Sequence, residues 1–282
     1  MTTRTANALA WPDLVWSHFS RPRFGQFDER VAAAAANGFA GIGLYVYDYQ
    51  RMRDQEGRSP ASLRNALAQH DLVLAEIEAV RGWWATTGAL YEEFVEVERL
   101  AFEMADEFGV RYLQVIGGTD HGVDEAVTGF ASLCDRAAEH GLLVGIEWLP
   151  YTNIPTAAAA QRIVEAADRP NGGYCVDIWH HTRGANDIGM IRDLGGERVF
   201  AVQMNDGTLV QSSPDDYKTD CLANRLPPGD GEFDCAGFVA TLREMGVVAP
   251  ISLEVCSTEL WAMPTMDAAQ RAADGMRRVL AA

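Results

Sequence analysis

Apolar runs of strand length alternate along the chain with segments of helical periodicity. Runs that are apolar on nearly every residue and are joined by helices are typical of a parallel sheet covered by helices. The predicted strands lie at 13–19, 41–46, 72–80, 111–117, 143–149, 173–179, 199–204 and 250–255. The predicted helices lie at 27–37, 60–69, 90–108, 123–140, 155–168, 185–195, 235–246 and 265–281.

Local start and stop signals support these boundaries. Ser59 precedes Pro60, which places a capping hydroxyl before a proline at a first helical position. Gly109 and Gly141 follow predicted helices where a left-handed cap is favourable. Eight strand–helix units in 282 residues match a closed (β/α)8 TIM barrel, so we expect an α/β fold with a single domain over 1–282. A doubly wound open sheet is the alternative, because periodicity does not show closure. No GxGxxG turn follows the first strand, which disfavours a dinucleotide fold.

One connection is longer than the others. Residues 205–234, between the seventh strand and the next helix, form a polar segment rich in Pro, Gly and Asp. Loops of this length in a compact domain are usually functional or disordered. We therefore expect an active-site loop there.

Composition narrows the range of partners. The formal net charge of −17 would repel a phosphate backbone, so neither nucleic acid nor an anionic membrane is expected as a partner. No segment approaches 18 consecutive apolar residues, and the N-terminal stretch has no signal-peptide pattern, which together predict a cytoplasmic protein. Five cysteines without CxxC spacing suggest neither a disulfide framework nor a thiolate zinc site.

Polar residues close four consecutive predicted strands. Catalytic groups of a barrel come from the carboxyl ends of its strands. Three carboxylates gathered there would need a compensating cation, because a buried, unpaired charge costs several kcal/mol. All-oxygen ligands favour Mn²⁺ or Mg²⁺, with Co²⁺ or Zn²⁺ as alternatives. The predicted ligands are Glu147, Asp177, Gln203 and Glu254.

The motifs around these residues, "GIEWLP", "VDIWH", "VQMND" and "SLEV", occur in an order that resembles the xylose-isomerase-like barrel family of sugar isomerases, epimerases and related endonucleases. The resemblance implies that Glu147, Asp177 and Glu254 bind metal and that His180 contacts the substrate. Gln203 stands where that family usually has histidine. In this respect the chain resembles some 3-dehydroshikimate dehydratases of the same fold, which have glutamine as a ligand. Arg225, in "RLPPGDGEFD", is implied to bind a substrate carboxylate, phosphate or hydroxyl.

Further polar and aromatic residues have weaker assignments. Glu76 and Glu78 alternate in the third predicted strand, share one face and need partners there, with Arg81 as one candidate. His18 could line the mouth of the pocket, and a structural role explains it equally well. His181 adjoins His180, but adjacent side chains need not face the same way, so we expect only His180 to reach the site. Asn205 and Asp206 are expected to support the site or anchor the loop. Tryptophans at strand ends could stack on a substrate ring. They are Trp83, Trp84, Trp148, Trp179 and Trp261, of which we expect Trp148 and Trp179 to bind substrate.

These residues predict a metal-dependent isomerase or epimerase acting on a sugar or a similar polyhydroxylated ketone. A divalent ion would polarise the carbonyl and stabilise an enediolate. Glu147 and Glu254 would serve as base and acid on opposite faces of the reacting carbon, and His180 would move protons between oxygens. The alternative is a lyase of the 3-dehydroshikimate dehydratase type, in which the enolate expels water. A multi-metal phosphodiesterase of this fold is disfavoured, because six histidines are too few for its histidine-rich metal cluster. The sequence is compatible with a homo-oligomer.

Overall fold

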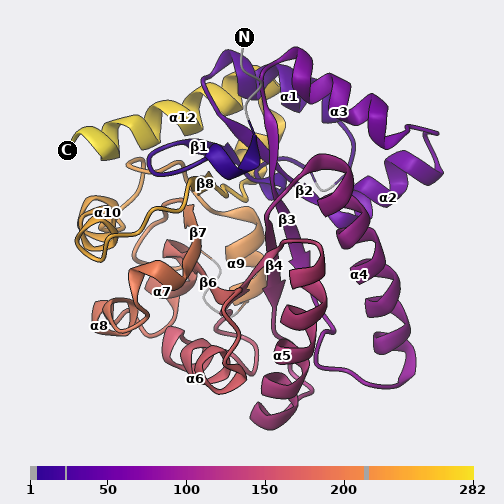
Figure 1. Cartoon of the computed structure of the whole chain (residues 1–282). Helices are drawn as coiled ribbons and strands as arrows, with labels where there is room; N and C mark the ends of the chain where they lie inside the picture. The colour runs from indigo at the N-terminus through magenta and orange to yellow at the C-terminus, as the bar shows by residue number, and fades with distance from the viewer. Residues whose placement is uncertain (1–4, 23, 213–215) are drawn as a thin grey trace.

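The computed structural model describes residues 5–22, 24–212 and 216–282 and contains a closed barrel of eight parallel strands (Figure 1). Neighbouring strands pair in sequence order, and the last pairs with the first through Leu14 and Ile251. This closure confirms the predicted TIM barrel and rules out the open sheet. The strands are β1 (Leu14–Trp16), β2 (Gly41–Tyr45), β3 (Val73–Val80), β4 (Tyr112–Ile116), β5 (Leu143–Glu147), β6 (Gly172–Asp177), β7 (Val199–Met204) and β8 (Ile251–Leu253).

Eight helices correspond to the predicted ones. They are α1 (Phe27–Ala36), α3 (Pro60–Gln69), α4 (Gly88–Phe108), α5 (Val123–Glu139), α6 (Ala157–Ala167), α8 (Ile188–Arg192), α10 (Cys235–Glu244) and α12 (Thr265–Ala281). The predicted capping residues lie at the ends of these helices. The Ser59 side chain accepts a hydrogen bond from the backbone N–H of Ser62 at the start of α3, and Gly109 caps the end of α4 with φ of 66°.

Seven further short helices were not predicted. Helices α2 (Val46–Asp54), α7 (Ile178–Arg183), α9 (Tyr217–Ala223) and α11 (Thr258–Ala262) follow strands β2, β6, β7 and β8, respectively. Short 3-10 turns form η1 (Ala6–Ala8), η2 (His18–Ser20) and η3 (Gly196–Arg198). The predicted sixth strand ran to residue 179, but β6 stops at Asp177 because the Asp177 side chain caps α7 by accepting from the backbone N–H of Trp179.

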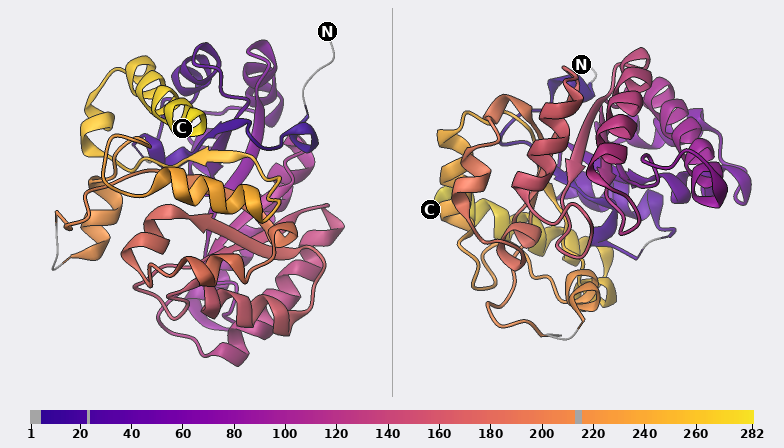
Figure 2. Two further views of the ribbon diagram at one scale, coloured as in Figure 1. Left: turned by 90° about the vertical axis from the view of Figure 1, so that its left-hand side faces the viewer. Right: turned by 90° about the horizontal axis from the view of Figure 1, so that it is seen from below.

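The helices surround the barrel as an outer layer (Figures 1 and 2). The last helix, α12, packs against α1, so the two ends of the chain complete the ring. Strand side chains such as Ile42, Leu113 and Val202 are fully buried. All five cysteines are free and buried. In the described part of the chain, no helix is long and apolar enough to cross a membrane.

The long connection between β7 and α10 spans residues 205–234 and contains α9. It is held at its start by Asp206, whose carboxylate accepts backbone N–H groups from Gly207, Gly229, Gly231 and Phe233 at 2.7–3.0 Å. Because a carboxylate offers about four acceptor sites, one side chain can organise both ends of the connection. These contacts hold the start of the connection against residues 229–233, and the expectation that Asp206 anchors it is met by them.

Candidate active site

A cavity of about 940 Å³ opens at the carboxyl ends of the strands. Polar residues on its wall include Gln114, Glu147, His180, Arg225 and Glu254. Aromatic residues also line it, namely Phe19, Phe24, Tyr45, Tyr47, Trp84 and Tyr151. A cavity with a mixed aromatic and polar wall suits a small ring that carries several hydroxyl groups.

The four predicted metal ligands are all at the carboxyl ends of adjacent strands. Glu147 and Asp177 are the last residues of β5 and β6, Gln203 lies in β7 directly beside Asp177, and Glu254 follows β8. All four side chains belong to buried residues. Glu147 and Glu254 line the cavity, while Asp177 and Gln203 are each one hydrogen bond away from a lining residue.

Arg225 lies between two of these carboxylates. Its Nη1 atom donates to Asp177 Oδ2 at 2.8 Å and to Glu254 Oε2 at 2.9 Å, and the residue is buried. The loop arginine is therefore part of the site, where its guanidinium compensates carboxylate charge. Substrate binding by Arg225 stays a prediction, since in these contacts it serves the protein's own carboxylates.

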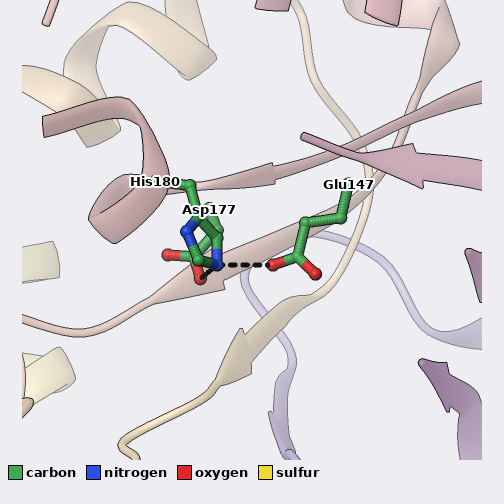
Figure 3. Close-up of side chains that lie close together, drawn as sticks. All are labelled: Glu147, Asp177 and His180. Carbon is green, nitrogen blue, oxygen red and sulfur yellow. Dashed lines mark ion pairs between the residues drawn. The ribbon is translucent and has the colours of Figure 1, made fainter. Parts of the chain in front are cut away.

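His180, Glu147 and Asp177 form a compact group (Figure 3). His180 Nε2 lies 3.2 Å from Glu147 Oε1 and 3.6 Å from Asp177 Oδ2. One ligand atom from each of the three residues lies within 4.8 Å of the others, so they could hold a metal ion. Helix α7 supplies His180 immediately after the strand that supplies Asp177.

Burial sets the protonation of these groups. Loss of hydration raises the pKa of Glu147 to about 8, and the neighbouring Asp177 charge raises it further. Loss of hydration also raises the pKa of Glu254 well above its ordinary value, although Arg225 opposes the shift. The same effect lowers the pKa of His180 to about 4, so its imidazole is neutral near pH 7.

A divalent cation fits this arrangement. Glu147, Asp177 and Glu254 would carry three negative charges when ionised, and Arg225 supplies one positive charge, which leaves two negative charges in a buried volume. Two oxygens, Glu147 Oε1 and Gln203 Oε1, are buried and lack a hydrogen-bond partner among the described residues. Buried acceptors usually have a hydrogen-bond partner, and a bound cation would take the place of that partner for both oxygens.

A second group of buried carboxyls lies on the neighbouring strands. Glu76 accepts a hydrogen bond from Ser252, and Glu78 accepts from Ser17 Oγ at 2.8 Å. Ser17 Oγ also lies 3.5 Å from Glu254 Oε1, which connects this group to the site. Gly43 makes the space, since a Cβ there would lie 1.6 Å from Glu78 Oε1. Burial raises the pKa of Glu76 to about 7 and that of Glu78 well above its ordinary value.

The prediction that Arg81 could pair with Glu76 and Glu78 was wrong. Its guanidinium is exposed and lies 3.9 Å from Glu93. Glu76 and Glu78 face the barrel interior, where hydroxyl groups and the His18 backbone N–H bind them.

The two tryptophans that were expected to bind substrate are both buried. Trp148 and Trp179 are buried and lie outside the set of residues that line the cavity, whereas Trp84 belongs to it. The Trp179 ring is fully buried, with the Arg183 guanidinium 4.7 Å, the Arg225 guanidinium 5.4 Å and the Phe233 ring 5.5 Å from its centre. Direct substrate contact by Trp148 and Trp179 stays a prediction.

The two other histidines considered from the sequence, His18 and His181, have structural surroundings. His18 Nδ1 lies 2.9 Å from Arg30 Nη1 inside the protein, and His181 packs on Phe238 with ring centroids 5.5 Å apart. His180 is thus the histidine that reaches the candidate ligands.

Two polar residues of the site were missed at the sequence level. Gln114 donates to Glu147 Oε2 at 2.8 Å, and Tyr217 Oη lies 2.9 Å from His180 Nδ1. Gln114 had a usable signal, because it is a lone amide inside the apolar run "RYLQVIG", as Gln203 is in "VFAVQM". Tyr217 had none, since it belongs to a helix in the long connection.

Residues 31–280 match the family described as xylose isomerase-like TIM barrel, and the chain belongs to that family. The 3-dehydroshikimate dehydratases of Pseudomonas putida and Pseudomonas aeruginosa are 27% and 30% identical over 261 residues, which is 91% of this chain. The chain spans only 40% of the length of those two proteins. Inosose isomerase of Bacillus subtilis is 27% identical over 143 residues, covering 50% of this chain and 49% of that protein.

Solved structures agree on the fold. A xylose isomerase-like TIM barrel/4-hydroxyphenylpyruvate dioxygenase fusion protein superimposes with a TM-score of 0.81 at 25% identity, over 94% of this chain and 42% of that one. A protein described as binding a zinc atom superimposes with a TM-score of 0.83 at 18% identity, over 95% of this chain and 98% of that one. The dehydratases and the isomerase named above are enzymes.

Proposed function

We propose that this protein is a divalent-metal-dependent enzyme that removes a proton next to the carbonyl of a small polyhydroxylated ketone. The observation that carries the proposal is the buried group of Glu147, Asp177, Gln203 and Glu254 at the base of a cavity with a mixed aromatic and polar wall. When bound, a divalent ion would polarise the substrate carbonyl and lower the cost of the enolate.

The side chains supply the proton transfers. Glu147 and Glu254 come from β5 and from the end of β8, both line the cavity, and each can exchange a proton with a carbon held between them. Gln114 orients Glu147 through one oxygen, and Arg225 and Gln203 orient Glu254. His180, neutral at pH 7, can hold or deliver a proton at a substrate oxygen.

The same enolate can react in two ways. We favour expulsion of a β-hydroxyl as water, because the relatives that align with 91% of this chain are 3-dehydroshikimate dehydratases. Return of the proton, which gives isomerisation or epimerisation, is the second candidate. It is favoured by the two carboxylates on separate strands and by the half-length similarity to inosose isomerase.

For the metal we propose Mn²⁺ or Mg²⁺, because the four predicted ligands provide only oxygen. Participation of His180 would introduce a nitrogen ligand and favour Zn²⁺, and Co²⁺ would also be accommodated. The proposed substrate is a small molecule, and a homo-oligomer remains compatible with the proposal.

Incubation in D₂O tests the proposal. Metal-loaded protein is mixed in turn with 3-dehydroshikimate, ketoinositols and ketoses. Growth of a conjugated ultraviolet chromophore identifies dehydration, and carbon-bound deuterium in recovered substrate or its isomer identifies proton return. The Glu254→Gln variant is the control, since it keeps the shape of the side chain and removes its basicity. Absence of both signals with every substrate would contradict the proposal.

A further inference from the structure

The predicted metal ligands occupy one half of the cavity wall. They come from β5, β6, β7 and the end of β8, which are consecutive strands around the closed barrel. Segments in or after β1 to β4 form the opposite wall, which carries aromatic side chains such as Phe19, Tyr45 and Trp84. A substrate held at the metal site therefore directs its far end toward the wall of β1 to β4.

Arg81 is the cation of that opposite wall. Among the described residues that line the cavity, the arginines and lysines are Arg81, Lys218 and Arg225. Lys218 and Arg225 belong to the long connection that follows β7, one of the strands that supply the ligands. Arg81 directly follows β3, so it stands across the cavity from the ligand set.

The strand register places Arg81 level with Glu147. Val80 pairs with Val115, and the next residue of β4, Ile116, pairs with Glu147. Neighbouring strands lie about 4.8 Å apart, so the backbones of β3 and β5 are separated by at most about 10 Å at this height. Arg81, Ile116 and Glu147 all line the cavity. A six-membered ring can therefore have oxygens at the metal site and a substituent on its opposite edge near Arg81.

The Arg81 guanidinium has donors available. Its ion pair within the described part of the chain joins Nη2 to Glu93 Oε1 at 3.9 Å, which is longer than a hydrogen bond. The same Glu93 oxygen accepts from the Tyr47 hydroxyl. The Arg81 side chain is 60% exposed, so a ligand in the cavity can reach its N–H groups.

Arg225 is committed to the protein's own groups. Its Nε donates to the Cys221 carbonyl oxygen at 2.9 Å, and its Nη1 donates to Asp177 and Glu254. Withdrawing it to bind a ligand would leave buried carboxylates without their ion-pair partner, which is strongly unfavourable. An anionic group of a substrate is therefore bound at lower cost by Arg81.

We propose that Arg81 binds a carboxylate of the substrate, on the edge of the ring opposite the oxygens that meet the metal site. A single guanidinium matches one carboxylate in charge and can hold it through two parallel N–H···O bonds. Arg81 is then the residue that selects an acidic ring ketone over neutral ketoinositols and ketoses. The inference rests on the proposed function for the reaction and names the class of substrate.

Binding of two matched probes tests this assignment. 3,4-Dihydroxybenzoate and 3,4-dihydroxybenzamide share the ring and two adjacent hydroxyl groups and differ in charge. Calorimetry with the full chain and saturating Mg²⁺ measures the Kd of each probe. We expect wild type to bind the benzoate at least about tenfold more tightly than the benzamide. Arg81→Met should weaken the benzoate by about 10- to 100-fold and leave the benzamide unchanged.

Two variants serve as controls. Lys218→Met removes one positive charge from the side of the cavity that carries the ligands, and Glu93→Gln removes the distant partner of Arg81. Both should keep the preference for the benzoate. A wild type without that preference would overturn the assignment, whether or not Arg81→Met folds. A preference lost in Lys218→Met and kept in Arg81→Met would overturn it as well.

Kinetics separate this inference from the proposed function. Arg81→Met should raise KM for 3-dehydroshikimate more than it lowers kcat, and it should leave turnover of a neutral ketoinositol unchanged. A carboxylate preference that depends on Arg81 in a protein without enolate chemistry would contradict the proposed function alone. Enolate chemistry in a protein without that preference would contradict the role of Arg81 alone.

Discussion

The amide of Gln203 donates a hydrogen bond from Nε2 to Glu254 Oε1 at 3.1 Å, and its own carbonyl oxygen is buried without a hydrogen-bond partner among the described residues. The donor half of the side chain therefore orients one carboxylate, and the acceptor half is free for a cation. This division fits the proposed role of Gln203 as a metal ligand beside Asp177.

Replacement of Gln203 by histidine should change the metal preference. An imidazole introduces a nitrogen ligand, which Zn²⁺ favours more strongly than Mg²⁺ or Mn²⁺ does. We expect the affinity ratio for Zn²⁺ over Mn²⁺, measured by competition calorimetry, to rise about tenfold or more. Asn205→His is the control, because its amide bonds Asp177 at 2.9 Å and is not a proposed ligand. An unchanged ratio in Gln203→His would remove Gln203 from the ligand set.

Glu254→Gln should abolish most turnover. The substitution preserves the hydrogen-bonding shape of the side chain but removes its ability to accept a proton, which we expect to lower kcat at least about 100-fold. Glu259→Gln is the matched control on exposed surface, where the carboxylate pairs with Arg271. Activity is measured with the substrate found in the D₂O screen. Near-normal turnover of Glu254→Gln would show that this residue transfers no proton.

Asp206→Asn should loosen the long connection. An amide oxygen cannot replace all four acceptor contacts of the carboxylate, and its N–H₂ group would face backbone donors. Loss of charge-assisted hydrogen bonds should cost about 2 kcal/mol or more. Hydrogen exchange at residues 229–233 should accelerate. Asp230→Asn removes exposed ion pairs with Arg271 and Arg278 and should have a smaller effect. Equal exchange in both variants would contradict the anchoring role.

Much of this site follows from strand-end residues, because an apolar run that closes on a polar group marks where a buried strand reaches the cavity. Glu147, Asp177 and Glu254 were found in this way. Glu76 could not be given its partner, because Ser252 lies 176 residues away and only barrel closure brings the two together. Tyr217 was missed because α9 has 7 residues, too few for an apolar stripe to be recognised.

The surroundings of the two tryptophans could not be predicted from the sequence. Trp148 and Trp179 follow strand ends directly, but the side-chain directions after a strand depend on the turn that comes next. Asp177 caps α7 and thereby turns Trp179 into the protein, under two arginines. Trp84, whose position after β3 is less direct, reaches the cavity.

Glu76→Gln should reduce the pH dependence of stability. Burial raises the pKa of Glu76 to about 7, whereas the unfolded chain has a value of about 4.3. Between these values the folded protein binds more protons, so the stability contributed by this group is complete below about pH 4 and is lost as pH rises through 7. We expect wild type, but not Glu76→Gln, to lose on the order of 2 kcal/mol from this group between pH 5 and 8.

Urea unfolding in the presence of a chelator measures this difference, since a bound cation would itself alter the carboxyl groups. Glu92→Gln on the exposed face of α4 provides a control that should follow wild type. Parallel pH profiles for wild type and Glu76→Gln would show that Glu76 is ionised in the folded protein without cost.

The central claim is that Glu147, Asp177, Gln203 and Glu254 together bind one divalent cation. The most direct test is a crystal structure of protein grown with Mn²⁺ and analysed by anomalous scattering at the manganese edge. We predict one strong anomalous peak per chain, bonded to an oxygen of each of these four side chains, with His180 Nε2 outside the coordination sphere. A well-ordered site without that peak, or a peak bonded elsewhere, would contradict the claim.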